Sequence, residues 1–409
     1  MAADWGTPGR HSLEGTPLTR GTTQRGARLY NERLILSLVR LHGQLPKAEM
    51  ARLTGLSAQT VSVIVRQLEA DGLLRRRTPQ RGKVGQPLVP FELDSNGAFS
   101  IGLKVGRRSG DLMLLDLAGR VRHTIHRPYT FPSPAELMGF VKSGVEELVS
   151  GLDREQRGRI SGMGIAAPFE LWNWAEDVGA PSDVLMAWKG LDLQAEIAKL
   201  FSWPIHFCND ASAACAAELL FGRGRDLQDF AYFYLGYFIG GGVVLNGSLY
   251  LGRHGNAGAL ASFPITSERG QSAQLVHSTS LAALERDIHR DGGDPELLWR
   301  DLGDWKGAGP ALDRWLTRAA LDVAAAAVGV MAVLDCSAIV IDGAVPLRVR
   351  TRFVDEVQKA LTRVDHKGLA EFPVLQGTVG ADARALGAAS LPLFDNFIIN
   401  RNVLFKEKA

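Results

Sequence analysis

The stretch QLPKAEMARLTGLSAQTVSVIVRQLEADGLLRRRTPQRGK, residues 44–83, predicts a helix-turn-helix followed by a basic hairpin. Pro46 has no amide hydrogen and is tolerated near a helix start, so the first helix is expected to begin there. Gly55 can adopt the positive φ of a sharp turn, and the Ser57 hydroxyl can cap the amides of the next helix. Two helices joined by such a turn form a helix-turn-helix.

The second helix of this stretch has an apolar face and a polar face. Apolar residues recur at the helical spacing and are expected to be buried together: Val61, Ile64, Val65 and Leu68. The opposite face carries hydrogen-bonding groups and one methyl-bearing side chain: Ser57, Gln59, Thr60, Ser62, Val63 and Arg66. These groups suit the edges of bases in the major groove. We therefore expect this helix to read double-stranded DNA.

The cations that follow predict a wing beside this helix. Asp71 and Gly72 would end the helix, and residues 79–82 would form the turn of a hairpin. The residues expected to contact phosphate or the minor groove are Arg75, Arg76, Arg77, Arg81 and Lys83, with Lys47 from the first helix. The alternative is a small helical domain with a solvated basic loop. The turn, the polar face and the cluster of cations together favour DNA binding.

Length and composition limit the class of protein. The chain has 409 residues, enough for two or three domains, and 46% hydrophobic residues, which predicts a globular bulk. Because the net charge is only +2, affinity for nucleic acid has to come from a local patch. Cys208, Cys215 and Cys336 form no CxxC pair, which indicates a reducing cytoplasm. The longest apolar run, Val323 to Leu334, is too short for a membrane span, and no signal peptide is visible, so no membrane partner is expected.

Changes in pattern along the chain predict four segments. We expect residues 1–28 to be a disordered arm, residues 29–84 the DNA-binding domain with a first helix from about Asn31, residues 85–97 a linker, and residues 98–409 a sensor domain. In the last segment, apolar runs of strand length alternate with helices, which predicts an α/β region with partly antiparallel sheets. Two similar sets of strands predict two lobes, 98–210 with the C-terminal helix and 211–390.

Several stretches of the α/β region resemble the ROK family of repressors, open reading frames and sugar kinases. The matching stretches, in chain order, are IGLKVGRRSGDLMLLDLAGRV (101–121), GMGIAAP (162–168), WKGLDL (188–193), NDASAACAAE (209–218), YLGYFIGGGVVLNGSLYLG (234–252), HGNAGALASF (254–263), IVIDGAV (339–345) and GADARALGAAS (380–390). The resemblance implies a two-lobed actin-like ATPase fold of the ribonuclease H-like class behind the winged helix-turn-helix.

The first phosphate loop departs from the family pattern. Family kinases open with an Asp-x-Gly-Gly-Thr loop, and the corresponding residues here are Lys104, Gly106, Arg107 and Arg108. A magnesium-ATP site needs a carboxylate for the cation and a small backbone turn near the phosphates. The two arginines would bind an anion or lie solvated at a strand end. The second loop, Gly240-Gly241-Gly242, fits either a phosphate cradle or close packing of the lobes.

The sugar and zinc ligands of the family are also replaced in part. The family's Gly-Glu-Ile-Gly-His corresponds to residues 258–262, so Ala259 stands in the place of the Glu and Ser262 in the place of the His. The segment 265–280 has no cysteine, where the family carries a zinc knuckle. Structural zinc needs four ligands, so we expect no metal and no cofactor.

Asn209 and Asp210 match the family pair that binds sugar hydroxyls, in which the Asp of the kinases is the catalytic base. Asp210 could instead cap the helix that follows. Tryptophan side chains nearby could stack on a sugar ring or belong to the core. The ligand-binding candidates are Asn209, Asp210, Glu170, Trp172, Asn173, Trp188 and Ser262.

These observations predict a DNA-binding transcriptional regulator that is not an enzyme. We expect a repressor whose degenerate kinase-like domain senses a sugar or a related small metabolite and so changes the affinity for an operator. Its expected assembly is a homodimer or a dimer of dimers in the cytoplasm. The alternative is an active, ATP-dependent sugar kinase with an accessory DNA-binding domain.

Overall fold

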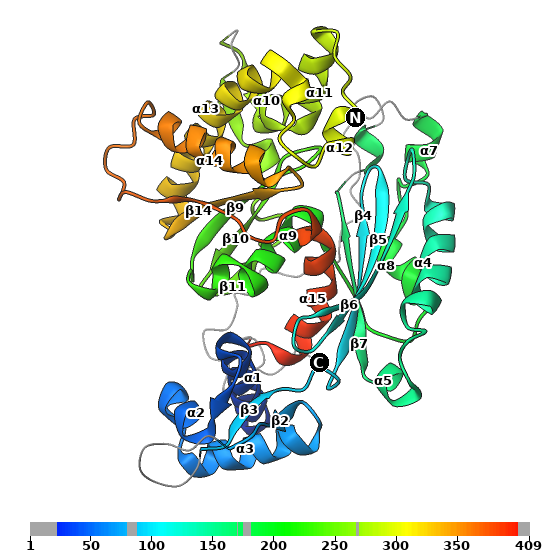
Figure 1. Ribbon diagram of the computed structural model, residues 1–409, viewed down its shortest axis with the longest axis vertical. Helices are drawn as coiled ribbons and strands as arrows, with labels where there is room; N and C mark the ends of the chain where they lie inside the picture. The colour runs from blue at the N-terminus through cyan, green and yellow to red at the C-terminus, as the bar shows by residue number, and fades with distance from the viewer. Residues whose placement is uncertain (1–22, 80–87, 170, 175–180, 267–269, 400–409) are drawn as a thin grey trace, which may run out of the picture.

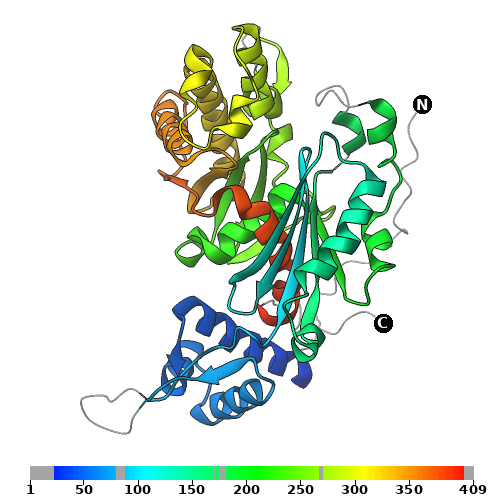
Figure 2. The same cartoon turned by 45° about the vertical axis from the view of Figure 1, so that its right-hand side comes forward.

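The computed structural model describes residues 23–79, 88–169, 171–174, 181–266 and 270–399. It has three parts, an N-terminal winged helix-turn-helix and two α/β lobes (Figure 1). The small domain lies at one end of the molecule, and the two lobes lie side by side at the other end. Helix α15 (Ala383–Phe397) runs between the lobes towards the small domain (Figure 2).

The N-terminal domain contains three helices and a three-stranded sheet. Its elements are α1 (Gln24–His42), β1 (Leu45–Pro46), α2 (Lys47–Thr54), α3 (Ala58–Ala70), β2 (Leu74–Arg76) and β3 (Pro90–Leu93). The sheet has the order β1-β3-β2 with antiparallel pairings. Gly55 follows α2 with a φ of +70°, and Ser57 Oγ accepts a hydrogen bond from Thr60 N at 3.1 Å. The predicted helix-turn-helix is therefore confirmed.

Two boundaries predicted for this domain are wrong. The first helix begins at Gln24 and not near Asn31, because the Thr23 hydroxyl caps it by accepting from Gly26 N at 2.9 Å. Part of the expected disordered arm is therefore helical. The expected linker, residues 85–97, contains β3, which pairs with β2 and so forms the second strand of the wing. The polarity of the local sequence alone predicts neither the early start of α1 nor strand β3.

The first lobe is built on a five-stranded sheet of order β6-β5-β4-β7-β8. Its elements are β4 (Phe99–Val105), β5 (Ser109–Asp116), β6 (Val121–Pro128), α4 (Pro134–Leu148), α5 (Arg154–Gly158), β7 (Ile160–Ala167), η1 (Leu171–Trp174), α7 (Ser182–Met186), α8 (Leu193–Ala198) and β8 (Ile205–Asn209). Strands β4, β7 and β8 are parallel, whereas β5 and β6 are antiparallel additions. Helix α4 covers one face of the sheet and α15 the other.

The second lobe repeats this plan with the sheet order β11-β10-β9-β14-β15. Its elements are α9 (Asp210–Phe221), η2 (Arg223–Arg225), β9 (Phe230–Leu235), β10 (Gly240–Leu245), β11 (Ser248–Tyr250), η3 (Leu260–Ser262), β12 (Pro264–Thr266), β13 (Ser272–Gln274), α10 (Leu275–Thr279), α11 (Leu281–Arg290), α12 (Leu297–Arg300), η4 (Lys306–Ala308), α13 (Gly309–Leu334), β14 (Ala338–Gly343), α14 (Leu347–Leu361), β15 (Val374–Gln376) and η5 (Gly380–Asp382). Helices α9 and α15 lie between the two sheets.

Helix α13 is long and apolar enough, by length and composition, to cross a membrane. Half of its most apolar window is nevertheless buried within the protein. Its buried side chains, among them Trp315 and Val323, pack against Phe353 of α14 and the β9–β14 sheet in the main core of the second lobe. The apolar character of α13 is therefore that of a central core helix.

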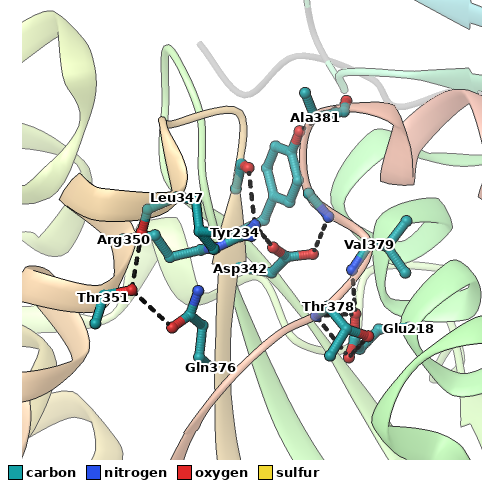
Figure 3. Close-up of polar contacts among 12 residues, drawn as sticks. Glu218, Tyr234, Asp342, Leu347, Arg350, Thr351, Gln376, Thr378, Val379 and Ala381 are labelled. Carbon is teal, nitrogen blue, oxygen red and sulfur yellow. Dashed lines mark hydrogen bonds and ion pairs between the residues drawn. The ribbon is translucent and has the colours of Figure 1, made fainter. Parts of the chain in front are cut away.

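A polar network ties β14 to the segment that leads into α15 (Figure 3). The buried Asp342 carboxylate forms an ion pair with Arg350, and it accepts from Gly380 N at 2.9 Å and from Tyr232 Oη at 3.2 Å. The buried Glu218 carboxylate of α9 accepts from Thr378 N at 3.1 Å and from Val379 N at 3.2 Å. Two buried carboxylates thus fix the turn at the start of α15.

Candidate DNA-binding surface and ligand cleft

Helix α3 separates the two faces as its sequence predicts. Its apolar residues lie in the core of the small domain: Val61, Ile64, Val65 and Leu68. Gln59, Val63 and Arg66 are exposed on the other side, and Val63 is 58% accessible to solvent. Within the part of the chain that the structure describes, Arg66 forms no ion pair. This exposed surface, with Arg66 on it, is available to a duplex.

The wing arginines are paired with carboxylates of the same domain. Glu92 accepts from Arg75 Nε at 2.5 Å and lies 3.0 Å from Arg77 Nε. Glu69 of α3 holds Arg76 at 2.5 and 2.9 Å. Glu92 cannot be recognised as a partner from sequence, because it faces Arg75 only through the register of β2 and β3. The arginines are oriented at rest, and DNA has to compete with Glu69 and Glu92 for them.

The remaining predicted DNA contacts are partly placed. Lys47 Nζ donates to Ser62 Oγ at 3.4 Å and lies 5.4 Å from the centre of the Phe91 ring, so it bridges α2, α3 and β3. Ser57 caps α3 by accepting a hydrogen bond from Thr60 N, and the two hydroxyl oxygens lie 2.8 Å apart. Arg81 and Lys83 lie outside the described residues. Contact of these residues with DNA stays a prediction.

Replacing Glu92 with Gln is expected to strengthen DNA binding at low salt. The change removes the carboxylate that competes with phosphate for Arg75 and Arg77. In the wild type Glu92 competes for both arginines, so completing their phosphate contacts would steepen the plot of log K against log salt by less than about 2. Fluorescence anisotropy with a labelled duplex over a salt series measures this slope. Glu356→Gln, which removes the partly buried partner of the exposed Lys359 in the second lobe, is the control, and an equal slope for both variants contradicts the expectation.

Lys104 occupies the place where the family kinases carry the metal-binding carboxylate. It is buried at the end of β4, and its Nζ donates to Asp111 Oδ2 at 2.6 Å and to Ser109 Oγ at 2.7 Å. Burial lowers the pKa of Lys104, an effect that nearby Arg384 adds to and Asp111 opposes. An ammonium group that is already paired repels Mg²⁺ from this position.

The two arginines of the first loop reach across to the second lobe. Arg108 Nη1 lies 2.9 Å from Glu296 Oε1, and its guanidinium lies 5.2 Å from the centre of the Trp299 ring. The Arg107 guanidinium lies 3.9 Å from the centre of the Phe238 ring. Both arginines therefore contact the second lobe, and anion binding by them stays a prediction. A hollow of about 580 Å³ remains between them, lined by Arg107, Arg108, Pro128, Tyr129, Thr130, Phe131, Tyr237 and Glu296.

The Gly-rich strand start is required by packing. A Cβ on Gly240 would come within 2.5 Å of Ala211 Cβ, and a Cβ on Gly242 within 2.5 Å of Cys215 Cβ. A Cβ on Gly241 would meet Leu260 Cδ1 at 2.5 Å. These contacts join β10 to α9 and η3, so the glycines are explained without a phosphate.

Asn209 and Asp210 lie at the junction of β8 and α9. Asn209 Oδ1 accepts from Ala211 N at 3.0 Å, so Asn209 caps α9 and Asp210 does not. Asp210 Oδ2 accepts from Arg384 Nη1 of α15 at 3.2 Å, and both side chains are mostly buried. Arg384 is a site residue that sequence reasoning missed, although it lies in the family-like stretch GADARALGAAS.

An aromatic hollow of about 250 Å³ lies beside Asn209. It is lined by Ala167, Pro168, Phe169, Leu171, Trp172, Trp188, Leu191, Asp192, Leu193, Gln194 and Phe207. Ala167, which lines the hollow, pairs with Asn209 in the parallel ladder of β7 and β8, so Asn209 lies one strand away from that wall. Apolar walls with a polar rim suit a small organic ligand.

The other predicted ligand contacts do not all meet here. Trp188 is 4% exposed and donates its indole N–H to Pro132 O at 2.7 Å, so it is largely a core residue that shows one edge to the hollow. Ser262 is exposed in η3 and does not line the hollow. Glu170 and the side chain of Asn173 lie outside the described residues. Within the described ranges, no group of three or more His, Cys, Asp or Glu residues is placed to hold a metal ion.

Comparison with known proteins gives two family matches. The model of the ROK family matches residues 100–393, and the model of the MarR family matches residues 30–83. An uncharacterized protein of Sinorhizobium fredii is 26% identical over 379 residues, which are 90% of this chain and 91% of that protein. The xylose repressor of Bacillus subtilis is 24% identical over 235 residues, 58% of this chain and 60% of the repressor.

Solved structures share the fold. A ROK family transcriptional regulator, a homolog of the Escherichia coli MLC protein, superposes with a TM-score of 0.65 at 19% identity and covers 92% of this chain and 99% of its own. A ROK family glucokinase from Streptomyces griseus, in complex with glucose and AMPPNP, has a TM-score of 0.55 at 22% identity and covers 72% of this chain and 99% of its own. The regulator matches 92% of this chain, which is more than the two lobes contain, so its match extends into the N-terminal domain.

Proposed function

This chain belongs to the ROK family, and we propose that it is a transcriptional repressor that binds an operator and responds to a carbohydrate or a related small metabolite. The observation that carries this proposal is the exposed polar face of α3 beside a wing of three oriented arginines. The MarR-type match to residues 30–83 and the regulators among the relatives support it. Selection of bound fragments from genomic DNA tests it.

The proposed assembly is a homodimer, or a dimer of dimers, in the cytoplasm. Two copies of α3 would enter successive major grooves about one helical turn apart, so the operator would be a near-palindrome. Ligand binding changes DNA affinity if the ligand binds one arrangement of the protein better than the other. Sedimentation of the protein with and without a palindromic duplex tests the stoichiometry.

The proposed ligand site is the aromatic hollow together with Asn209 and Asp210. The face of Trp172 can stack on the C–H face of a sugar, while the polar pair supplies hydrogen-bonding groups for hydroxyls. D-Xylose is a reasonable first probe because one relative is named a xylose repressor. Calorimetric titration of the wild type and Trp172→Ala with D-xylose and D-glucose tests the site, and equal affinity of both proteins for a bound sugar contradicts it.

Catalysis is not part of the proposal. The residues that would hold metal and accept a proton, at positions 104 and 210, are a buried lysine and an aspartate paired with Arg384. The sugar kinases among the structural neighbours make phosphoryl transfer the second candidate function. Sugar-dependent ATP hydrolysis that is lost in Asp210→Asn would establish that the protein is a sugar kinase and would contradict the proposal of a regulator without catalytic activity.

Replacing Gln59 with Ala is expected to relax sequence choice. Gln59 is exposed in the first turn of α3, where a side-chain amide can pair with a base edge, and its loss should cost about 1–3 kcal/mol on the preferred site. Arg76→Ala should instead weaken all sequences alike and lower the salt slope. Competition binding with cognate and scrambled duplexes measures both. The same loss of discrimination in the two variants would contradict this division between helix and wing.

A further inference from the structure

Two helices connect the ligand cleft, which is the aromatic hollow together with Asn209 and Asp210, to the DNA-binding domain. Helices α9 and α15 begin together at the cleft, where Asp210 and Arg384 are paired at 3.2 Å. Both end at the small domain, where Phe221 and Phe397 line a small hollow with Leu36, Ser37 and Arg40 of α1. The two helices therefore run parallel, and Figure 2 shows α15 passing from between the lobes to the N-terminal domain. With 15 residues, α15 is about 22 Å long.

The middle of the pair is packed backbone against backbone. A Cβ on Gly387 of α15 would lie 1.7 Å from Ala213 O of α9, and a Cβ on Gly164 of β7 would lie 1.9 Å from Ala388 O. Ser100 Oγ of β4 donates to Ala389 O at 2.5 Å. No side chain separates these elements at these points, so a displacement of α15 is not absorbed by changes of rotamer. Packed interfaces of this kind shift between discrete arrangements.

The far end of the pair is joined to the DNA-binding domain. Phe397 packs against the core of that domain, and Ile399 N donates to Ser37 Oγ of α1 at 3.0 Å. The Arg40 guanidinium of α1 lies 5.6 Å from the centre of the Phe221 ring of α9. Burial at this junction, with Arg225 nearby, lowers the pKa of Arg40 to about 10. Helix α1 thus contacts the ends of both α9 and α15.

The cleft end is where a ligand would act. Arg384 lies against the Tyr234 ring, 5.2 Å from its centre, and Tyr234 Oη donates to Ala381 O at 3.4 Å just before α15. In the proposed ligand site, a hydroxyl-bearing ligand bound to Asp210 would share the carboxylate with Arg384. A ligand that hydrogen-bonds to Asp210 therefore competes with Arg384 or reorients it.

We propose that the α9–α15 pair is the relay from the ligand cleft to the DNA-binding domain, and that Arg384 is the positioning residue that sets its resting state. The inference rests on the proposed function and specifies how its ligand site is coupled to DNA. While the Asp210–Arg384 pair is closed, the two helices are held in one register and α1 is fixed at their far ends. When the pair opens, α15 shifts along α9 and α1 moves with it, which changes the placement of α3.

The test uses the full chain without ligand or DNA. Hydrogen exchange is followed by mass spectrometry in the wild type, Arg384→Met, Asp210→Asn and the double variant. Each single variant is expected to speed exchange of the α1 amides, residues 24–42, about fivefold or more, and the double variant to add nothing further, because both changes break one pair. Asp210→Asn retains the size of the side chain and serves if Arg384→Met does not fold.

Arg318→Met is the matched control. It removes an ion pair with the buried Asp287, at 2.8 Å, on helix α13 of the second lobe and away from α15. It is expected to leave exchange in α1 unchanged. Faster exchange that stays near the cleft, or an equal response of α1 to Arg318→Met, overturns the relay. Because no DNA or sugar is used, either result leaves operator binding by the wild type to be judged separately.

Discussion

Replacing Arg75, Arg76 and Arg77 together with Ala is expected to lower DNA affinity by on the order of 100- to 1,000-fold at about 0.1 M salt. The three side chains lie on one strand and the residue that follows it, and they are the oriented cations of the wing. Each complete phosphate contact contributes about 0.9 to the salt slope, so the slope should fall by up to about 3, and by less where Glu69 or Glu92 still competes for an arginine. Anisotropy titrations over a salt series measure both quantities on the same samples.

Folding of the triple variant has to be separated from its loss of DNA contacts. The three side chains are exposed, and the core of the domain does not include them, so its circular dichroism and melting temperature should resemble those of the wild type. The matched control is the triple replacement Arg290, Arg300 and Arg352 to Ala, which removes three exposed cations of the second lobe. A similar loss in the control would mean that overall charge, and not the wing, determines affinity.

Replacing Asp342 with Ala is expected to lower the free energy of unfolding by about 3–5 kcal/mol. The change leaves the Arg350 guanidinium buried without its partner. It also removes the acceptor for Tyr232 Oη and for the amide of Gly380. Figure 3 shows Asp342 between Arg350 and the segment before α15. Denaturation by guanidinium chloride, followed by tryptophan fluorescence, measures the change in the free energy of unfolding of the lobes.

Asp313→Ala is the control for this experiment. Asp313 pairs with Arg352 at 2.7 Å, but both side chains are more than half exposed, so the loss should be less than about 1 kcal/mol. A comparable loss of unfolding free energy in the two variants would contradict the claim that the Asp342 network stabilises the second lobe more than a surface ion pair does. The protein has several domains, so its unfolding need not be two-state. The midpoint and slope of the unfolding curve are therefore compared between the two variants before a free energy of unfolding is calculated.

Local chemistry predicts much of this fold from sequence. Gly55, Ser57 and the spacing of apolar residues predict the helix-turn-helix where the structure has it. The Asn246-Gly247 pair predicts the hairpin between β10 and β11, and Asn246 takes a φ of +54° there. These features depend on one turn or one helical face, so the information lies within a few residues.

Features that depend on contacts between distant residues cannot be predicted from the sequence alone. The pairing of Asp210 with Arg384 joins residues 174 positions apart, and Arg75 and Arg77 meet Glu92 only after β2 and β3 align. Trp188 is expected at a ligand site from its position in a family-like stretch, yet its indole N–H is satisfied by Pro132 and its ring is mostly core. Residue type predicts what a side chain can do, but the fold decides which partner it has.

Selection of DNA fragments by the full chain from its own genome tests the central claim most directly. The repressor account predicts that a few near-palindromic sites are enriched, that their binding weakens steeply with salt, and that a carbohydrate shifts their affinity. Uniform recovery of fragments with no preferred site would contradict it.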